Sequence, residues 1–404
     1  MVQPLHIRGA HIWEGHGGAV QRDLFTTDVI TDKPANGAQV VDLDGYTIFP
    51  GLINAHDHLE LNHYPRSKFR DRYDNAHQWG EDMNARLDSE PYKSLRAYPL
   101  WDRLFIGGLK NLLCGAMTVA HHNPPHKELW RKDFPVRVLR KYGWAHSLHF
   151  STDAEIVESY RSTPKDTPWF IHLAEGTDDV ATGEYQRLKA LGCVERNTVI
   201  VHGVGLQYED AIDFYTTINA HVGNGIKLVL CPSTNCYLLD ALIYVRIPAM
   251  IATPMIGSDS RLTSRGDLLD ELNFAYEHFN IAPRTWVLGS VTEKARRSLS
   301  LDGVGQLASL DYADYVAIRK SLNDEIQFCT SCRADLALIV KGGVPQIGDP
   351  DVMAKFPQVQ TVAATLDGKP KRIHIDLVRR IHANQLKERG LDVDELPKEK
   401  FRIW

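Results

Sequence analysis

The clearest candidates for chemistry in this sequence are imidazole and carboxylate side chains that follow short apolar runs. His56 and His58 come after the run FPGLINA, and His172, His202 and Asp259 each follow a later run of the same kind. Residues i and i+2 of a strand point to the same side, so His56 and His58 can direct two imidazoles toward one point. Neutral imidazoles with a carboxylate suit zinc or a similar divalent metal. The pattern therefore favours one metal ion per chain, with Zn expected and Fe or Mn as alternatives.

Each of these residues also has a purely structural interpretation. A His-x-His pair occurs by chance in solvated loops, and a single buried histidine is more often a hydrogen-bonded core residue. Asp259 could cap a helix beginning near Gly266 or bond within a turn. The functional interpretation is favoured because several such residues follow apolar runs at the same register, which is a rarer coincidence than any one of them alone.

The apolar runs recur at regular intervals, and amphipathic stretches such as 185–191, 209–218 and 268–279 lie between them. This is the pattern of repeated βα units in a parallel sheet. Steps of 23 to 30 residues separate the expected strand ends, which are Ala120, His149, His172, His202, Leu230 and Ser258. With residues 49–58 this makes seven strands, whereas a closed barrel needs eight. The eighth could lie in 135–139 or between 59 and 111, or the barrel could be irregular.

The two ends of the chain have a different residue pattern from the middle. Residues 5–13 and 38–49 are short strand-like stretches, and alternating apolar residues with glycine turns return after residue 312. We therefore expect an α/β fold, a distorted (β/α)8 TIM-type barrel with a small β-sandwich domain formed by both chain ends. The predicted domains are 1–50 plus 312–372 for the sandwich, 51–311 for the catalytic barrel and 373–404 for a C-terminal helical tail.

Composition and charge limit the classes of partner. A formal net charge of −5 gives no broad basic field for nucleic acid or anionic membrane, so a small-molecule substrate is favoured. No apolar run approaches the length of a bilayer span, and the N-terminal residues lack a secretory pattern, so we expect a cytoplasmic protein. The six cysteines suggest reduced thiols rather than a disulfide framework, and Cys329-x-x-Cys332 lacks the second pair that a zinc site needs.

Six segments in order resemble motifs of the amidohydrolase superfamily, and the resemblance covers nearly the whole chain. It is strongest to the single-metal branch that contains triazine hydrolases and aminopurine or pyrimidine deaminases. The segments are PGLINAHDHLE (50–60), GAMTVAHHNP (115–124), FIHLAEGTD (170–178), VIVHGVGL (199–206), LCPSTN (230–235) and IGSDSRLT (256–263). The resemblance implies the metal ligands His56, His58, His172 and Asp259.

The resemblance also implies three catalytic residues. Glu175 would shuttle a proton beside the substrate, and His202 would polarise or position the attacking water. Asp259 would accept a proton from that water. No lysine on a middle strand resembles the carboxylated bridge of the two-metal subtypes, so one metal is expected.

The sequence departs from many deaminases of this branch at Leu230, where their motif begins with histidine. The pocket wall therefore lacks one polar group, and His122 and Asn123 could replace that contact. The loop 60–79 mixes cations with aromatic residues, so Arg70 and Trp79 could hold a planar or anionic substrate. A solvated loop is an equal alternative. Arg261 could also face the pocket, or serve the start of the next helix.

These observations predict a metal-dependent hydrolase that acts on a carbon–nitrogen bond of a small planar or cyclic substrate, as deaminases and amidases do. A hydrolase of a lactam, ester or C–Cl bond is the alternative, and a non-catalytic scaffold with this fold is a further one. The family often assembles through barrel faces, so a homodimer is expected.

Overall fold

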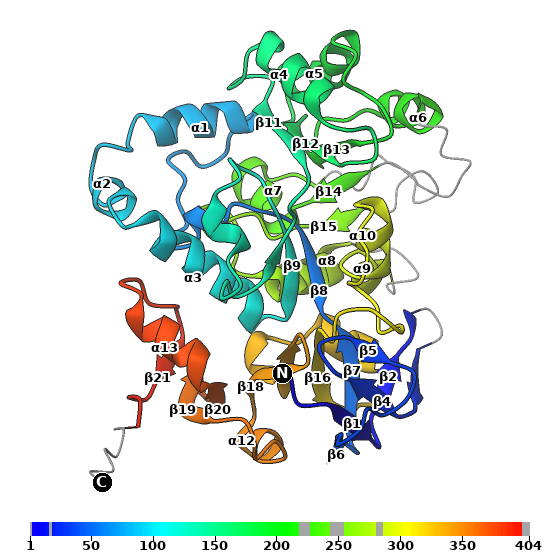
Figure 1. Cartoon of the computed structure of the whole chain (residues 1–404). Helices are drawn as coiled ribbons and strands as arrows, with labels where there is room; N and C mark the ends of the chain where they lie inside the picture. The colour runs from blue at the N-terminus through cyan, green and yellow to red at the C-terminus, as the bar shows by residue number, and fades with distance from the viewer. Residues whose placement is uncertain (1, 16–17, 218–226, 243–253, 280–285, 398–404) are drawn as a thin grey trace.

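The computed structural model describes residues 2–15, 18–217, 227–242, 254–279 and 286–397. Eight parallel strands follow one another in chain order through the middle of the molecule (Figure 1). They are β8 (Leu52–Asp57), β9 (Ala116–His121), β10 (Arg137–Val138), β11 (Gly143–Ser147), β12 (Trp169–Leu173), β13 (Thr198–His202), β14 (Leu228–Leu230) and β15 (Met255–Ile256).

The eight strands pair in two parallel groups, β10-β9-β8 and β11-β12-β13-β14-β15. The first and last strands of this series are joined where the Asp259 amide donates to the carbonyl oxygen of His56 (3.0 Å). Gly257 permits this close approach, since a Cβ there would lie 2.6 Å from the Cβ of His56. The TIM-type barrel is confirmed, and its eighth strand, β10, lies within 135–139, one of the alternatives that the sequence left open.

Helices connect and cover the barrel strands, as the amphipathic stretches predicted. Leu, Ile, Val and aromatic side chains on their inner faces pack against the strands in one large buried cluster. The helices of this region are α1 (Ala76–Asn84), α2 (Tyr92–Arg96), α3 (Leu100–Leu113), α4 (Asp153–Ser162), α5 (Asp179–Ala190), α6 (Tyr208–Thr217), α7 (Pro232–Leu239), α8 (Leu268–His278), α9 (Trp286–Gly289) and α10 (Glu293–Ser298), with the 3₁₀ turns η2 (Leu59–Leu61) and η3 (Lys127–Trp130).

Both ends of the chain contribute to the sheets below the barrel in Figure 1. A four-stranded sheet has the order β5-β4-β1-β6, and a nine-stranded sheet has the order β21-β19-β20-β18-β17-β16-β7-β2-β3. The N-terminal strands are β1 (Leu5–Arg8), β2 (His11–Trp13), β3 (Ala19–Gln21), β4 (Leu24–Thr26), β5 (Ile30–Thr31), β6 (Gln39–Asp42) and β7 (Tyr46–Pro50). The C-terminal strands are β16 (Tyr315–Arg319), β17 (Leu338–Lys341), β18 (Val344–Gly348), β19 (Thr361–Leu366), β20 (Lys369–His374) and β21 (Leu391–Val393).

The two sheets share a second apolar core, in which Leu5 and Ile7 of one sheet pack with Ile48 and Leu338 of the other. Between the C-terminal strands lie α11 (Asp324–Cys329), α12 (Pro350–Met353) and α13 (Ile375–Ala383), with the turn η6 (Arg333–Asp335). The small β-sandwich built from both chain ends is thus confirmed, whereas the exact domain boundaries stay a prediction.

The predicted helical tail over 373–404 needs correction. Among residues 373–397, which the structure describes, α13 is the one helix, and the chain then extends as β21, which pairs antiparallel with β19. The alternation of Leu391 and Val393 around Asp392 fits a strand that has one buried side at Leu391. Residues 398–404 of the predicted tail lie outside the described part of the chain.

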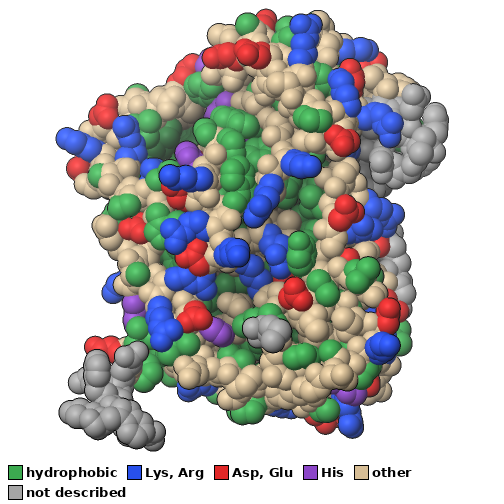
Figure 2. Space-filling view, viewed as in Figure 1, with side chains coloured by type: hydrophobic (Ala, Val, Ile, Leu, Met, Phe, Trp, Pro, Cys, Tyr) green, Lys and Arg blue, Asp and Glu red, His purple; other side chains and the backbone are tan. Residues whose placement is uncertain are grey.

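The surface agrees with the modest net charge. Acidic and basic side chains are interspersed over the face shown in Figure 2. Within the described residues, none of the helices combines the length and apolar character needed to span a membrane.

Helices α7 and α8 are joined by a buried carboxyl group. Glu271 of α8 accepts hydrogen bonds from the amide (2.9 Å) and the hydroxyl of Ser233, in the first turn of α7. The carboxyl thereby satisfies an N–H that the start of a helix leaves without an intrahelical partner. Burial raises the pKa of Glu271 from 4.5 to about 8, so the protonated form predominates at neutral pH.

This pKa predicts a pH-dependent stability. Because the folded-state value lies above the unfolded one, the contribution of Glu271 is fully present below pH 4.5 and is lost as the pH rises through about 8. We expect Glu271→Gln to reduce the fall in Tm between pH 6 and pH 9, measured by differential scanning calorimetry. The control is Glu277→Gln, an exposed carboxylate on the same helix. An equal fall in Tm for wild type and Glu271→Gln would contradict the expectation.

Candidate metal centre and cavity

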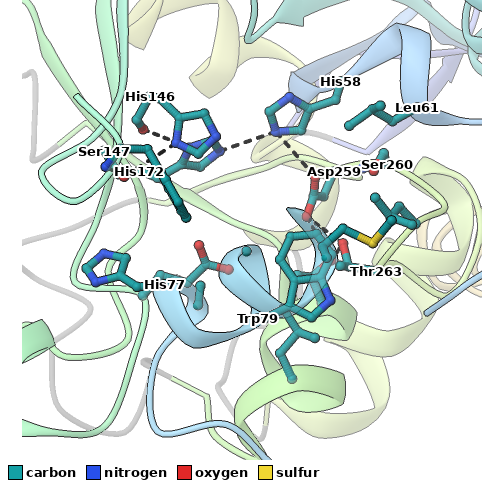
Figure 3. Close-up of a pocket in the computed structure, with 18 of the residues that line it drawn as sticks. His58, Leu61, His77, Trp79, His146, Ser147, His172, Asp259, Ser260 and Thr263 are labelled. Carbon is teal, nitrogen blue, oxygen red and sulfur yellow. Dashed lines mark hydrogen bonds and ion pairs between the residues drawn. The ribbon is translucent and has the colours of Figure 1, made fainter. Parts of the chain in front are cut away.

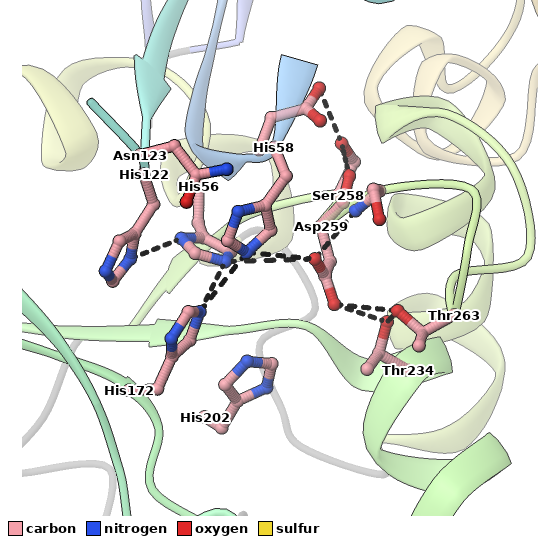
Figure 4. Close-up of polar contacts among 12 residues, drawn as sticks. His56, His58, His122, Asn123, His172, His202, Thr234, Ser258, Asp259 and Thr263 are labelled. Atoms are coloured by element: carbon pink, nitrogen blue, oxygen red, sulfur yellow. Dashed lines mark hydrogen bonds and ion pairs between the residues drawn. The ribbon is translucent and has the colours of Figure 1, made fainter. Parts of the chain in front are cut away.

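The four predicted metal ligands meet at one end of the barrel (Figure 4). His56 and His58 lie on β8, His172 lies on β12, and Asp259 follows β15. The Nε2 atom of His172 is 3.3 Å from the Nε2 atoms of both His56 and His58. Asp259 Oδ1 is 3.9 Å from His56 Nε2 and 3.7 Å from His58 Nε2. Four potential ligand atoms from three segments of the sequence therefore face a common point.

Hydrogen bonds on the far side of two rings fix which nitrogens carry protons. His122 Nε2 donates to the carbonyl oxygen of Ala145 (3.0 Å), which leaves its Nδ1 to accept from His56 Nδ1 at 3.3 Å. His172 Nδ1 donates to the carbonyl oxygen of His146 (2.9 Å). A neutral imidazole has only one N–H, so the Nε2 atoms of His56 and His172 both present lone pairs to the cluster.

Two lone pairs at 3.3 Å repel each other unless a cation lies between them. A shared proton does not fit, because burial lowers the pKa of His56 and of His172 well below the usual range and neighbouring histidines lower it further. In a tetrahedral zinc site with bonds of about 2.0–2.1 Å, the ligand atoms lie about 3.3–3.4 Å apart. The donor set and its spacing thus fit a divalent transition metal.

The carboxylate of the cluster is held in place by its own hydrogen bonds. Asp259 Oδ2 accepts from the hydroxyls of Thr234 (3.1 Å) and Thr263 (2.9 Å), and Oδ1 accepts from the Ser260 amide (2.7 Å). Asp259 also has a positive φ of 51°, and His202 at the end of β13 has one of 71°. Such conformations are strained in residues other than glycine and concentrate at functional sites.

His202 and Cys231 lie close to His56. His202 Nδ1 is 2.8 Å from Asn235 Oδ1, to which it donates, so its Nε2 presents a lone pair. Burial lowers the pKa of His202, which keeps the ring neutral. Cys231 lies within reach of His56 and His202, but burial raises the pKa of its thiol well above the usual range. Because thiolates rather than thiols bind metals, Cys231 is a poor ligand here.

A cavity of about 420 Å³ opens over the cluster (Figure 3). His58, His172, Glu175, His202 and Asp259 border it on one side. Its other walls are largely apolar and consist of Leu61, Tyr64, Trp79, Met83, Leu87, Phe150, Leu238 and Leu262. Among the described residues, no lysine or arginine lines this cavity. The space therefore suits a small ligand with apolar parts and offers no cation to an anionic one.

Glu175 borders the cavity beside the cluster. Its carboxyl group is buried, and this burial raises its pKa well above the usual value, with the nearby Asp259 and Glu184 adding to the effect. Glu175 Oε1 lies 3.5 Å from His202 Nδ1. A carboxyl group with a raised pKa can act as a general acid.

Helix α1 is attached directly to the segment that carries Glu175. The Ala76 amide donates to the carbonyl oxygen of Glu175 (2.8 Å), and the Thr177 amide donates to that of Asp74 (2.8 Å). His77 pairs with Glu184 at 3.1 Å, and Glu184 accepts a hydrogen bond from the Ala174 amide (2.6 Å). Because α1 also supplies Trp79 and Met83 to the cavity, one helix connects the cavity wall with the Glu175 segment.

The structure brings some of the predicted substrate-binding residues to the cavity and leaves others away from it. Asn123 and Trp79 line it. His122 lies behind His56 and orients that ring. Arg70 pairs with Asp82 at 2.7 Å, and the buried Arg261 forms two hydrogen bonds with Glu388, at 2.6 and 2.9 Å. Neither arginine reaches the cavity, since its guanidinium group is held by a carboxylate elsewhere.

Sequence reasoning gave no role to several residues of the site. His146, His77 and Glu184 line the cavity, and Asp57 and Lys110 form a fully buried ion pair (2.9 Å) beneath the cluster. The position of Asp57 between two ligands was a usable signal, since alternate strand residues point to opposite faces. A lysine within the apolar run of residues 100–113 was another.

Comparison with protein-family models found no matching model, and comparison with curated protein sequences found no similar one. Solved structures, in contrast, share the fold. The zinc-bound adenosine deaminase of Xanthomonas campestris is 16% identical, with a TM-score of 0.65 over 88% of this chain and 96% of that one. The zinc-complexed atrazine chlorohydrolase of Arthrobacter aurescens is 14% identical, with a TM-score of 0.65 over 88% and 99%.

A third similar structure is the aminofutalosine deaminase of Helicobacter pylori, 14% identical with a TM-score of 0.57 over 85% of this chain and 99% of that one. All three structures belong to the amidohydrolase superfamily. The resemblance that the ordered motifs indicated is therefore confirmed at the level of the fold.

The contact between His122 and His56 predicts an effect on metal affinity. His122→Phe removes the acceptor that fixes the tautomer of His56, and loss of such a partner typically costs about 10–100-fold in affinity. We expect zinc affinity, measured by competition with a chromogenic chelator, to fall by that factor. His126→Phe, the same change in the following loop, is the control and should bind zinc as wild type does. Unchanged affinity in His122→Phe would show that the tautomer does not depend on residue 122.

Proposed function

We propose that this protein is a metal-dependent hydrolase that releases an amine or ammonia from a carbon–nitrogen bond of a small, cyclic substrate. His56, His58, His172 and Asp259 would hold one divalent ion, with zinc expected. When bound, such an ion supplies Lewis-acid chemistry, which lowers the pKa of water and polarises the electrophile. The single observation that carries the proposal is the buried carboxyl group of Glu175, whose pKa burial raises, beside a cluster of converging imidazole lone pairs.

The residues of the chain can supply the proton transfers of this reaction. The water oxygen adds to an sp² carbon, and the C–N bond then breaks. Asp259 and the unprotonated Nε2 of His202 border the cavity beside the cluster and would accept the water proton. Glu175 would give its own proton to the leaving nitrogen, because an amine leaves far more readily when protonated.

The alternative is hydrolysis of a lactam, ester or C–Cl bond in the same cavity. A chloride ion needs no proton in order to leave, so a carboxyl group with a raised pKa at residue 175 favours a nitrogen leaving group over a halide. A scaffold without catalysis is disfavoured by the complete donor set.

The charges around the cavity also favour some substrates over others. Arg66 and Lys68 of loop 60–79 donate to backbone carbonyls rather than into the cavity. With acidic groups at the base and no cation in the described walls, a neutral or cationic substrate is favoured over an anionic one. We infer in addition a cytoplasmic location, supported by six free cysteines, and a homodimeric assembly as in much of the superfamily.

The first test separates metal binding from proton transfer. We expect His172→Ala to lose both bound zinc and turnover, because it removes a ligand. Glu175→Gln should keep about one zinc per chain and lose roughly 10²–10⁴-fold in kcat, because only the acid is removed. Zinc is measured by elemental analysis and turnover by ammonia release. The exposed His278→Ala serves as the control. Full activity in metal-free wild type would refute the proposal.

The second test concerns the bond and the charge of the substrate. In a panel of amino-, amido- and chloro-heterocycles, we expect ammonia or amine release from neutral compounds, and kcat/KM at least about 10-fold lower for carboxylated or phosphorylated analogues. Chloride release without ammonia release would favour the alternative function. A preference for anionic analogues would contradict the charge assignment of the cavity.

A further inference from the structure

A fully buried lysine lies beneath the candidate metal centre. Lys110 of α3 has no exposed surface. Its three N–H groups have three acceptors, which are Asp57 Oδ2 at 2.9 Å, the Ser258 hydroxyl at 3.0 Å and the carbonyl oxygen of Asp259 at 3.3 Å. No donor of this ammonium group is left without a partner.

The acceptors of Lys110 come from both strands that carry the cluster. Asp57 lies between His56 and His58 on β8, whereas Ser258 and Asp259 follow β15. The two strands do not pair in a ladder within the described chain. The Asp259 amide donates to the carbonyl oxygen of His56, and Asn54 of β8 accepts from the Ser258 amide (2.9 Å) and donates to the Ser258 hydroxyl (2.8 Å). Lys110 therefore connects β8 and the segment after β15 at the point where their ligands must meet.

Close packing of α3 brings the lysine to this position. A Cβ on Gly107 would lie 2.1 Å from the carbonyl oxygen of Leu59, so only glycine allows the helix to approach η2 this closely. Lys110 and Asn111 follow three and four residues later on the same face of the helix. Asn111 also binds Asp57 Oδ2, at 2.6 Å, and Asn62 binds Oδ1, at 2.9 Å.

We propose that Lys110 is a positioning residue for the metal centre, which holds Asp259 in register with His56 and His58 through Asp57 and Ser258. The inference rests on the proposed function, since it concerns the same ion. A buried ion pair contributes little net stability compared with apolar packing of similar volume, so stability alone does not account for it. Directional hydrogen bonds and ion pairs fix the separation between two strands better than apolar contacts do.

The test uses the metal affinity and the visible spectrum of bound Co²⁺. In Lys110→Met, Asp57 loses its cationic partner and the chain can lose stability for that reason alone. The double variant Asp57→Asn/Lys110→Met removes both charges and should recover most of the Tm. We expect both variants to bind Zn²⁺ about 10–100-fold more weakly than wild type and to show altered Co²⁺ absorption bands, because Asp259 is no longer fixed.

A matched control is Lys371→Met. Lys371 is also buried and pairs with Asp349 at 2.6 Å, but in the β-sandwich. We expect it to lower Tm and to leave Zn²⁺ affinity and the Co²⁺ spectrum as in wild type. Should neither Lys110 variant fold, Ser258→Ala removes one hydroxyl of the network and keeps the ion pair; it should weaken Zn²⁺ binding and alter the Co²⁺ bands.

The outcomes separate this inference from the proposed function. Wild-type affinity and Co²⁺ bands in the double variant, or in Ser258→Ala where that variant is needed, would overturn the role of Lys110 while leaving the metal centre intact. A wild-type chain that binds neither Zn²⁺ nor Co²⁺ would instead refute the proposed function itself. If Lys371→Met lost Zn²⁺ affinity to the same extent, the loss in the Lys110 variants would reflect general destabilisation, and the inference would likewise be overturned.

Discussion

The site depends on the repulsion between two unprotonated nitrogen atoms, His56 Nε2 and His172 Nε2, which are held 3.3 Å apart. His56 and His172 cannot relieve this repulsion by turning, because their opposite nitrogens are engaged with His122 and with the carbonyl oxygen of His146. They cannot relieve it by protonation either, because burial lowers the pKa of both rings. The surrounding hydrogen bonds thus prepare an environment in which a divalent cation is the stabilising occupant.

The barrel explains how candidate ligands more than 200 positions apart, His56 and Asp259, come together. Parallel strands bring their carboxyl ends to the same face, so side chains from different βα units can reach a common point. The joint between β8 and the segment after β15 is the most demanding part, since the first and last ligands come together there. Gly257 permits the approach, and the Asp259 amide bonds to the backbone of β8. The β-sandwich lies below, and within the described residues it contributes no side chain to the cavity.

Much of the fold followed from the sequence, because apolar runs with helical spacers identify a parallel barrel and its strand ends. The strand β10 is only two residues long, so it left no run that distinguishes it from a loop. Strand β21 could not be recognised in the sequence for a similar reason, since a strand of only three residues shows little periodicity. The strand count from the sequence was seven, one short of a closed barrel, so it did not establish closure.

The candidate ligands could be recognised because metal binding limits residue types, and strand ends limit their positions. Substrate contacts were harder to predict, since they depend on which way a loop side chain turns. Trp79 lines the cavity, whereas Arg70 on the same loop turns to Asp82, and nothing in residue type distinguishes these outcomes. Arg261 is equally instructive, because its partner Glu388 lies 127 residues away in sequence. Long-range ion pairs of this kind leave no local pattern.

The attachment of α1 to the Glu175 segment has a consequence for how this enzyme scaffold could change its specificity. The helix that shapes the apolar wall is bonded through its first residue, Ala76, to the carbonyl oxygen of Glu175. A substitution that tilts α1 to admit a bulkier ring would also shift the carboxyl group relative to the imidazoles. A change of α1 that admits a new ligand shape therefore also affects the reaction rate. Substitutions that alter only the side-chain volume at Met83 or Leu87 would disturb the position of Glu175 least.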